Sequence, residues 1–92
     1  VVLDSNTYTV SRGEQVLELP KKEFELLYKL LSYPGQIFTR NQLLDDIWGF
    51  DSESGEDTVK THISRLRNKL RAIEEFRIIT IKGLGYKAEV LE

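Results

Sequence analysis

The order of elements in this sequence predicts an α+β fold, with an N-terminal antiparallel sheet, three helices and a C-terminal β-hairpin. Three observations support this prediction. Short β-prone segments separated by turn residues fill the first 19 positions, apolar residues then recur at helical spacing in three segments, and two strands around a glycine turn close the chain. Ninety-two residues suffice for one domain with a single modest core.

Three short strands are expected in the N-terminal region: Val1–Leu3, Thr7–Ser11 and Gln15–Leu19. Tyr8 and Val10 would share one face of the second strand, because side chains alternate along a strand. The apolar residues of the third strand break strict alternation, so its register stays open. Residues 11–14 predict a hairpin turn in which Gly13 is free to take a positive φ.

The first helix is expected from about Lys21 to Tyr33, where the apolar residues share one broad face and Pro34-Gly35 ends the helix. The spacing of its apolar residues makes it the central core helix. A second, shorter helix is expected to end near Trp48. Thr39 and Gln42 have the spacing of a capping box, which marks its start.

The third helix is predicted from about Glu56 to Ile73, with one apolar stripe formed by Val59, Ile63, Leu66 and Leu70. Residues 77–81 and 86–91 then read as strands joined by a turn at Gly83-Leu84-Gly85. A second helix, a turn, a third helix and a hairpin, in that order, are the winged variant of the helix-turn-helix.

Charge is distributed unevenly along the chain. Residues 58–88 hold eight basic and two acidic residues, a net charge of +6, although the whole chain carries −2. Residues 1–57 hold five basic and eleven acidic residues, a net charge of −6. A helix and a hairpin that carry positive charge are suited to binding duplex DNA, which the acidic part of the chain would repel.

The third helix has a polar side opposite its apolar stripe. At about 100° per residue the stripe covers about 60°, and the opposite side holds Thr61, Ser64, Arg65 and Asn68, flanked by Lys60 and Lys69. Arg65 can pair with guanine in bidentate fashion, and Thr61 can contact a thymine methyl group. Asn68 lies far along the helix, which favours phosphate over a base. Beside the glycine turn, Lys82 can enter a minor groove or pair with phosphate.

Other kinds of site are disfavoured. The chain has no Cys, and His62 is its only His, so we expect no metal site and no cofactor. Residues 51–57 lack the spacing of a calcium loop, and residues 83–88 match a dinucleotide fingerprint without the helix that it requires. No catalytic set is apparent, so the protein is not expected to be an enzyme. Apolar runs are too short to cross a membrane, and we expect a cytoplasmic protein.

Four segments resemble the DNA-binding effector domains of OmpR/PhoB-type response regulators. Leu19–Leu27 is similar to the start of the first helix of that family, and Phe38–Leu44 with Ile47-Trp48-Gly49 is similar to the second. Thr58–Leu70 resembles the recognition helix, and Ile81–Tyr86 resembles the wing. The match follows the family's order and spacing over nearly the whole chain.

The resemblance implies the C-terminal half of a two-component transcription factor. A receiver domain outside this chain would be phosphorylated by a histidine kinase. Two copies would bind direct repeats of promoter DNA head to tail, and the isolated chain would be monomeric. The loop between the second and third helices would face RNA polymerase; its residues include Gly49, Phe50, Asp51, Ser52 and Glu53.

The resemblance also implies roles for single residues. Thr61, Ser64 and Arg65 would reach bases, and Lys82 would take the minor-groove position of the wing. Contacts with the DNA backbone would come from Trp48, Thr58, Arg67, Thr80 and Tyr86, and the polar side of the third helix with its flanks adds Lys60, Asn68 and Lys69. The chain departs from the family at Asp57, where Arg is common, at Lys60, where Asp is frequent, and at Ser64, where a second Arg is often found.

An alternative function is a winged-helix module that binds an acidic protein. The overall charge of −2 and the acidic loop before the third helix are compatible with this function. The two hypotheses differ in one observable property, since only the first requires binding to duplex DNA at low salt.

Overall fold

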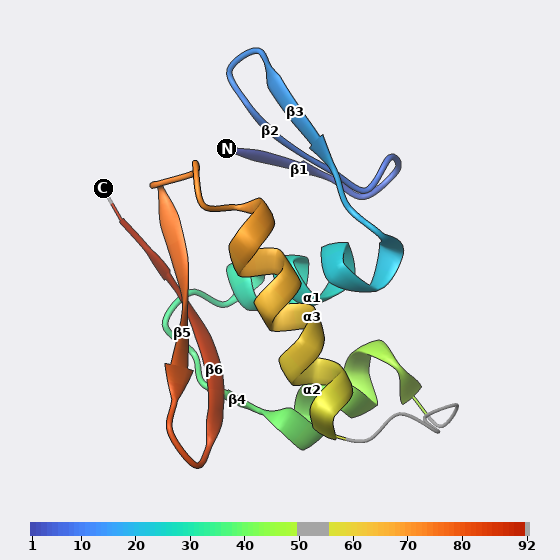
Figure 1. Ribbon diagram of the computed structural model, residues 1–92, viewed down its shortest axis with the longest axis vertical. Coiled ribbons are helices and arrows are strands. Elements are labelled where there is room, and N and C mark those ends of the chain that lie inside the picture. The colour runs from blue at the N-terminus through green and yellow to red at the C-terminus, as the bar shows by residue number, and fades with distance from the viewer. Residues whose placement is uncertain (50–55, 92) are drawn as a thin grey trace.

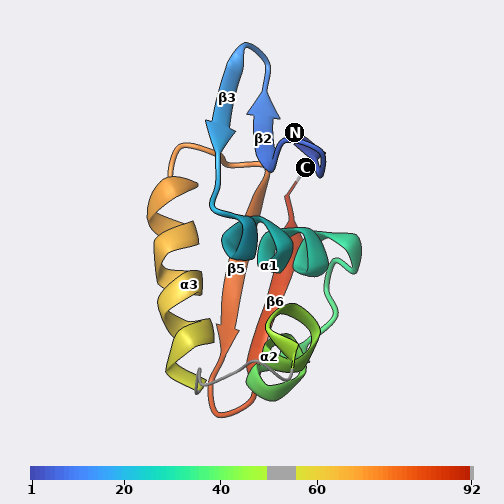
Figure 2. The same ribbon diagram turned by 90° about the vertical axis from the view of Figure 1, so that its right-hand side faces the viewer.

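The computed structural model describes residues 1–49 and 56–91. Within them the chain forms two three-stranded sheets and three α-helices. The N-terminal sheet lies at one end of the molecule, α1 crosses the middle, and α2 and the tip of the C-terminal hairpin lie at the other end (Figures 1 and 2). This is the winged helix-turn-helix arrangement that the sequence predicts.

The N-terminal sheet consists of β1 (Val2–Asp4), β2 (Thr9–Arg12) and β3 (Gln15–Glu18), all antiparallel. Val10 pairs with Leu17, which fixes the register that the sequence left open and turns both side chains toward the core. Gly13 takes a φ of 60° in the turn between β2 and β3, as expected.

Tyr8 corrects the predicted start of the second strand. Its φ is 54°, the left-handed region that few side chains adopt, and β2 begins at Thr9, two residues after the predicted start at Thr7. The ring still reaches the core by another route, because it packs edge-on against Phe24 with centroids 5.5 Å apart. The backbone carbonyl of Tyr8 also accepts a hydrogen bond of 3.0 Å from the amide of Leu19.

Helix α1 (Lys21–Ser32) carries Leu26, Leu27 and Leu30, which are fully buried and form the centre of the core. The chain then forms β4 (Phe38–Thr39), a two-residue strand that pairs with β6 and that the sequence analysis did not predict. Helix α2 (Arg40–Ile47) follows at once, and its capping box is present as predicted. Thr39 Oγ1 accepts from the Gln42 amide at 3.1 Å, and Gln42 Oε1 accepts from the Thr39 amide at 2.8 Å.

Helix α3 spans Glu56–Lys69 and ends four residues before the predicted Ile73. The apolar stripe is confirmed, since Val59, Ile63, Leu66 and Leu70 are all buried. Ile73 is only partly buried, and it lies in the connection to the hairpin rather than in the helix.

The hairpin is formed by β5 (Phe76–Ile81) and β6 (Gly85–Val90). Gly85, expected in the turn, is instead the first residue of β6. It faces β4 so closely that a Cβ atom there would lie 1.9 Å from the carbonyl oxygen of Phe38. Only glycine permits this approach. The second glycine of the turn therefore has a packing role, while Gly83, with a φ of 76°, shapes the turn itself.

Arg12 attaches the N-terminal sheet to the rest of the domain. Its guanidinium donates to the carbonyl of Ala72 at 2.9 Å and pairs with Glu75 at 2.9 Å, both in the connection between α3 and β5.

Within the part of the chain that the structure describes, no helix is long and apolar enough to cross a membrane.

Candidate nucleic-acid interface

Helix α3 presents a polar face to solvent. Four side chains lie opposite its buried stripe and are exposed: Thr61, Ser64, Arg65 and Asn68. None of them forms a side-chain hydrogen bond or ion pair within residues 1–49 and 56–91. Lys60 is exposed beside them. The face is therefore free to bind an external partner with hydroxyl, amide and guanidinium groups.

The turn of the hairpin lies at the same end of the molecule as the N-terminal end of α3 (Figures 1 and 2). Lys82 and Leu84 are exposed at this turn, which a hydrogen bond of 2.9 Å from the Leu84 amide to the Ile81 carbonyl closes. The first turns of α3 and the Lys82 turn thus face one region of space. We call the exposed side of α3 together with this turn the basic face.

Arg67 connects α3 to the hairpin. Its guanidinium donates to the carbonyl of Ile78 at 3.0 and 3.3 Å and to the hydroxyl of Thr80 at 2.6 Å. The two predicted backbone-contact residues, Arg67 and Thr80, are therefore in contact with each other. This arrangement fixes the distance between the helix and the hairpin, which a rigid binding surface requires.

Lys69 does not lie where the sequence analysis expected it. Its ammonium group pairs at 2.7 Å with Glu23, whose side chain is 2% exposed, on the first turn of α1. A buried carboxylate needs such a partner, so the ion pair holds Lys69 away from the polar face of α3. The missed signal is Glu23 itself, an acid set directly before Phe24 on the apolar side of a core helix.

Two further predicted residues, Trp48 and Thr58, lie around the start of α3. Trp48, at the C-terminal end of α2, is half-buried and packs edge-on against His62 with centroids 4.8 Å apart. His62 in turn hydrogen-bonds through Nδ1 to the carbonyl of Thr58 at 2.7 Å. Trp48 and Thr58 are thus held at the junction of α2 and α3.

Tyr86 is 4% exposed and belongs to the core. A direct contact between its ring and a phosphate, which the resemblance implies, has little surface available, and the residue supports the hairpin from inside instead.

Gly49 has a φ of 63° after α2. The other residues of the predicted polymerase-facing loop, 50–53, lie outside the described residues.

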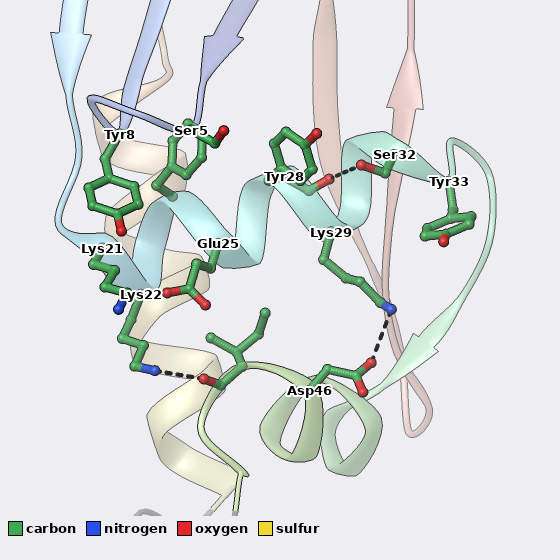
Figure 3. Close-up of a pocket in the computed structure, with 12 residues that line it drawn as sticks. Ser5, Tyr8, Lys21, Lys22, Glu25, Tyr28, Lys29, Ser32, Tyr33 and Asp46 are labelled. Carbon is green, nitrogen blue, oxygen red and sulfur yellow. Dashed lines mark hydrogen bonds and ion pairs between the residues drawn. The ribbon is translucent and has the colours of Figure 1, made fainter.

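A separate hollow of about 730 Å³ lies between α1, α2 and the β1–β2 turn. Figure 3 shows Lys22 and Lys29 reaching from α1 toward α2, where they bind the Ile47 carbonyl at 2.7 Å and Asp46 at 3.2 Å. One oxygen of Glu25 is buried there without a hydrogen-bond partner. This hollow shares no lining residue with the basic face.

No group of His, Asp or Glu side chains among the described residues could hold a metal ion.

Comparison with known proteins assigns the family. A family model described as the C-terminal domain of transcriptional regulatory proteins matches residues 13–88. The chain belongs to this family. Among curated relatives, the heme response regulator HssR of Staphylococcus saprophyticus is 42% identical over 97% of this chain, and HssR of Staphylococcus aureus strain JH9 is 41% identical over the same share. This chain spans 40% of the length of both relatives.

Solved structures of DNA-binding domains are similar to this chain and support the same family. The AdeR DNA-binding domain in complex with an intercistronic region superposes with a TM-score of 0.82 at 28% identity, over 98% of this chain and 94% of that one. The Klebsiella pneumoniae RstA DNA-binding domain in complex with the RstA box gives 0.78 at 32% identity, over 95% and 88%. The predicted resemblance to OmpR/PhoB-type effector domains is confirmed.

Proposed function

We propose that this chain is the sequence-specific duplex DNA-binding domain of a two-component response regulator. The observation that carries the proposal is the basic face, where an unpaired polar side of α3 and the Lys82 turn are presented together. The DNA-bound states of the related AdeR and RstA domains support it. Helix α3 would enter the major groove, and the turn would meet the minor groove or the backbone beside it.

Each side chain takes a role that its chemistry permits. Thr61, Ser64 and Arg65 read base edges from the exposed side of α3, and Lys82 reaches into the minor groove. Backbone contacts come from the residues that border this face: Trp48, Thr58, Lys60, Arg67, Asn68 and Thr80. Lys69 and Tyr86 are left out of this set, because one is paired with Glu23 and the other is buried.

The partners of the longer protein are also part of the proposal. The relatives are response regulators about two and a half times as long as this chain, and this relation supports a receiver domain under the control of a histidine kinase. Binding of two copies to direct repeats and contact of the α2–α3 loop with RNA polymerase follow from the same resemblance. A cytoplasmic location accords with such a regulator.

Salt dependence tests the proposed function. We expect the logarithm of the association constant for a selected duplex to fall linearly with the logarithm of salt concentration, with a slope between about −2 and −5, since each neutralised phosphate contributes roughly −0.9. Fluorescence anisotropy with a labelled duplex measures this salt slope. Lys21→Ala, which removes an exposed cation of α1 outside the basic face, should leave the slope unchanged. Absence of binding at low salt would instead favour a protein-interaction module.

A further inference from the structure

Two rows of polar and cationic side chains border the space between α3 and the hairpin. On α3 the row recurs at i, i+4, i+7 and i+11 and consists of Lys60, Ser64, Arg67 and Arg71. The contacts of Arg67 with Ile78 and Thr80 show that this flank faces β5. Arg71 lies just beyond the end of α3 and lines one hollow together with Arg67, which places it at the end of the row.

The second row belongs to the hairpin. Arg77 lies near the start of β5 and Lys82 directly follows its end, five positions later, so about 16 Å of extended chain separates the two. Lys60 and Arg71 are separated by a similar distance, about 16 Å along a helix. Helix α3 and strand β5 run in opposite directions, so the N-terminal end of α3 lies at the same end of the molecule as the hairpin turn (Figure 1). Arg71 and Arg77 line one hollow at the other end.

The far end of these rows forms an arginine cluster. Arg67, Arg71 and Arg77 line one hollow of about 270 Å³ between the end of α3 and β5. Arg71 and Arg77 are exposed and have no side-chain partner within the described part of the chain. Glu75 pairs with Arg12, and Glu89, opposite Arg77, lies 3.9 Å from Lys87. Glu74 is exposed and forms no ion pair with either arginine within the described residues.

We propose that Arg71 and Arg77 form an additional phosphate-binding site for duplex DNA. The inference rests on the proposed function. One DNA strand would follow the space between α3 and the hairpin from Lys82 to the arginine cluster. Guanidinium groups pair with phosphate oxygens in bidentate fashion, and this pairing makes arginine well suited to the position. The continuous row through Arg67 favours the DNA backbone over an acidic protein.

The double variant Arg71→Gln/Arg77→Gln tests the site. We expect its salt slope for duplex binding to be smaller in magnitude than that of the parent by roughly 1.8, because two phosphate contacts are lost. The ranking of duplexes of different sequence should be unchanged, since phosphates carry no base information. Thermal unfolding by circular dichroism should show a parent-like transition, and Lys21→Ala serves as the matched loss of a cation outside the rows.

Three possible results distinguish a failure of the proposed function from a failure of the arginine site. A parent chain that binds no duplex at low salt would overturn the proposed function itself. A parent that binds, with a double variant of the same slope and affinity, would overturn only the arginine site. A double variant that keeps its duplex binding but loses binding to polyglutamate would assign the cluster to an acidic protein and would equally overturn the DNA inference.

Discussion

Replacing Lys69 with alanine is expected to lower the free energy of unfolding by about 3 kcal/mol, a loss typical of removing one partner from a buried ion pair. Glu23 is 2% exposed and pairs with Lys69 at 2.7 Å. Without the ammonium group its carboxylate would be left charged in the interior or would have to bind a proton. Urea denaturation at neutral pH, followed by circular dichroism, measures the change.

Two companion variants make this result specific. Asp46→Asn removes the exposed pair with Lys29, whose side chains are 46% and 29% exposed, and it should cost less than about 1 kcal/mol. Adding Glu23→Gln to Lys69→Ala should recover part of the lost stability, because the unpaired charge is gone. If Lys69→Ala were as stable as the parent and instead reduced the salt slope of DNA binding, Lys69 would be a phosphate contact as the sequence suggested.

Arg65→Ala is expected to have the largest effect on base preference. A bidentate arginine–guanine pair contributes about 1–3 kcal/mol of discrimination, so affinity for the preferred duplex should fall roughly 5- to 150-fold. Affinity for a scrambled duplex should change far less, because that complex lacks the base contact. Competition anisotropy with both duplexes measures the ratio.

Arg67→Ala is expected to affect DNA binding differently from Arg65→Ala. It removes the proposed phosphate contact and also the link to Ile78 and Thr80, so it should weaken binding to both duplexes about equally and reduce stability. If Arg65→Ala also weakened both duplexes by the same factor, Arg65 would contact the backbone and base reading would belong to other residues.

Local sequence signals predicted much of this structure. Helical periodicity located the stripe from Val59 to Leu70, and the spacing of Thr39 and Gln42 located the start of α2. Both signals depend on residues within one turn or a few turns of each other. The exposed side of α3 was predictable for the same reason, because a helix with one buried stripe has a defined opposite face.

Contacts between distant segments were not predictable in this way. Strand β4 has only two residues and exists because β6 lies beside it. The partner of Lys69 is 46 residues away in sequence, and Arg12 reaches the Ala72 carbonyl 60 residues away. Charge alone assigned Lys69 to the DNA, since a sequence does not show which of several cations a buried acid will bind.

Amide chemical-shift mapping tests the central claim most directly, because it shows which surface meets the duplex. Titrating a selected duplex into the isotope-labelled chain should shift the amide signals of Thr61, Ser64, Arg65 and Lys82 together, with one saturation curve. The signals of Val16 and Tyr28, exposed on the N-terminal sheet and on α1, should stay in place. Shifts confined to the N-terminal sheet or α1, with α3 and the Lys82 turn unaffected, would contradict the account.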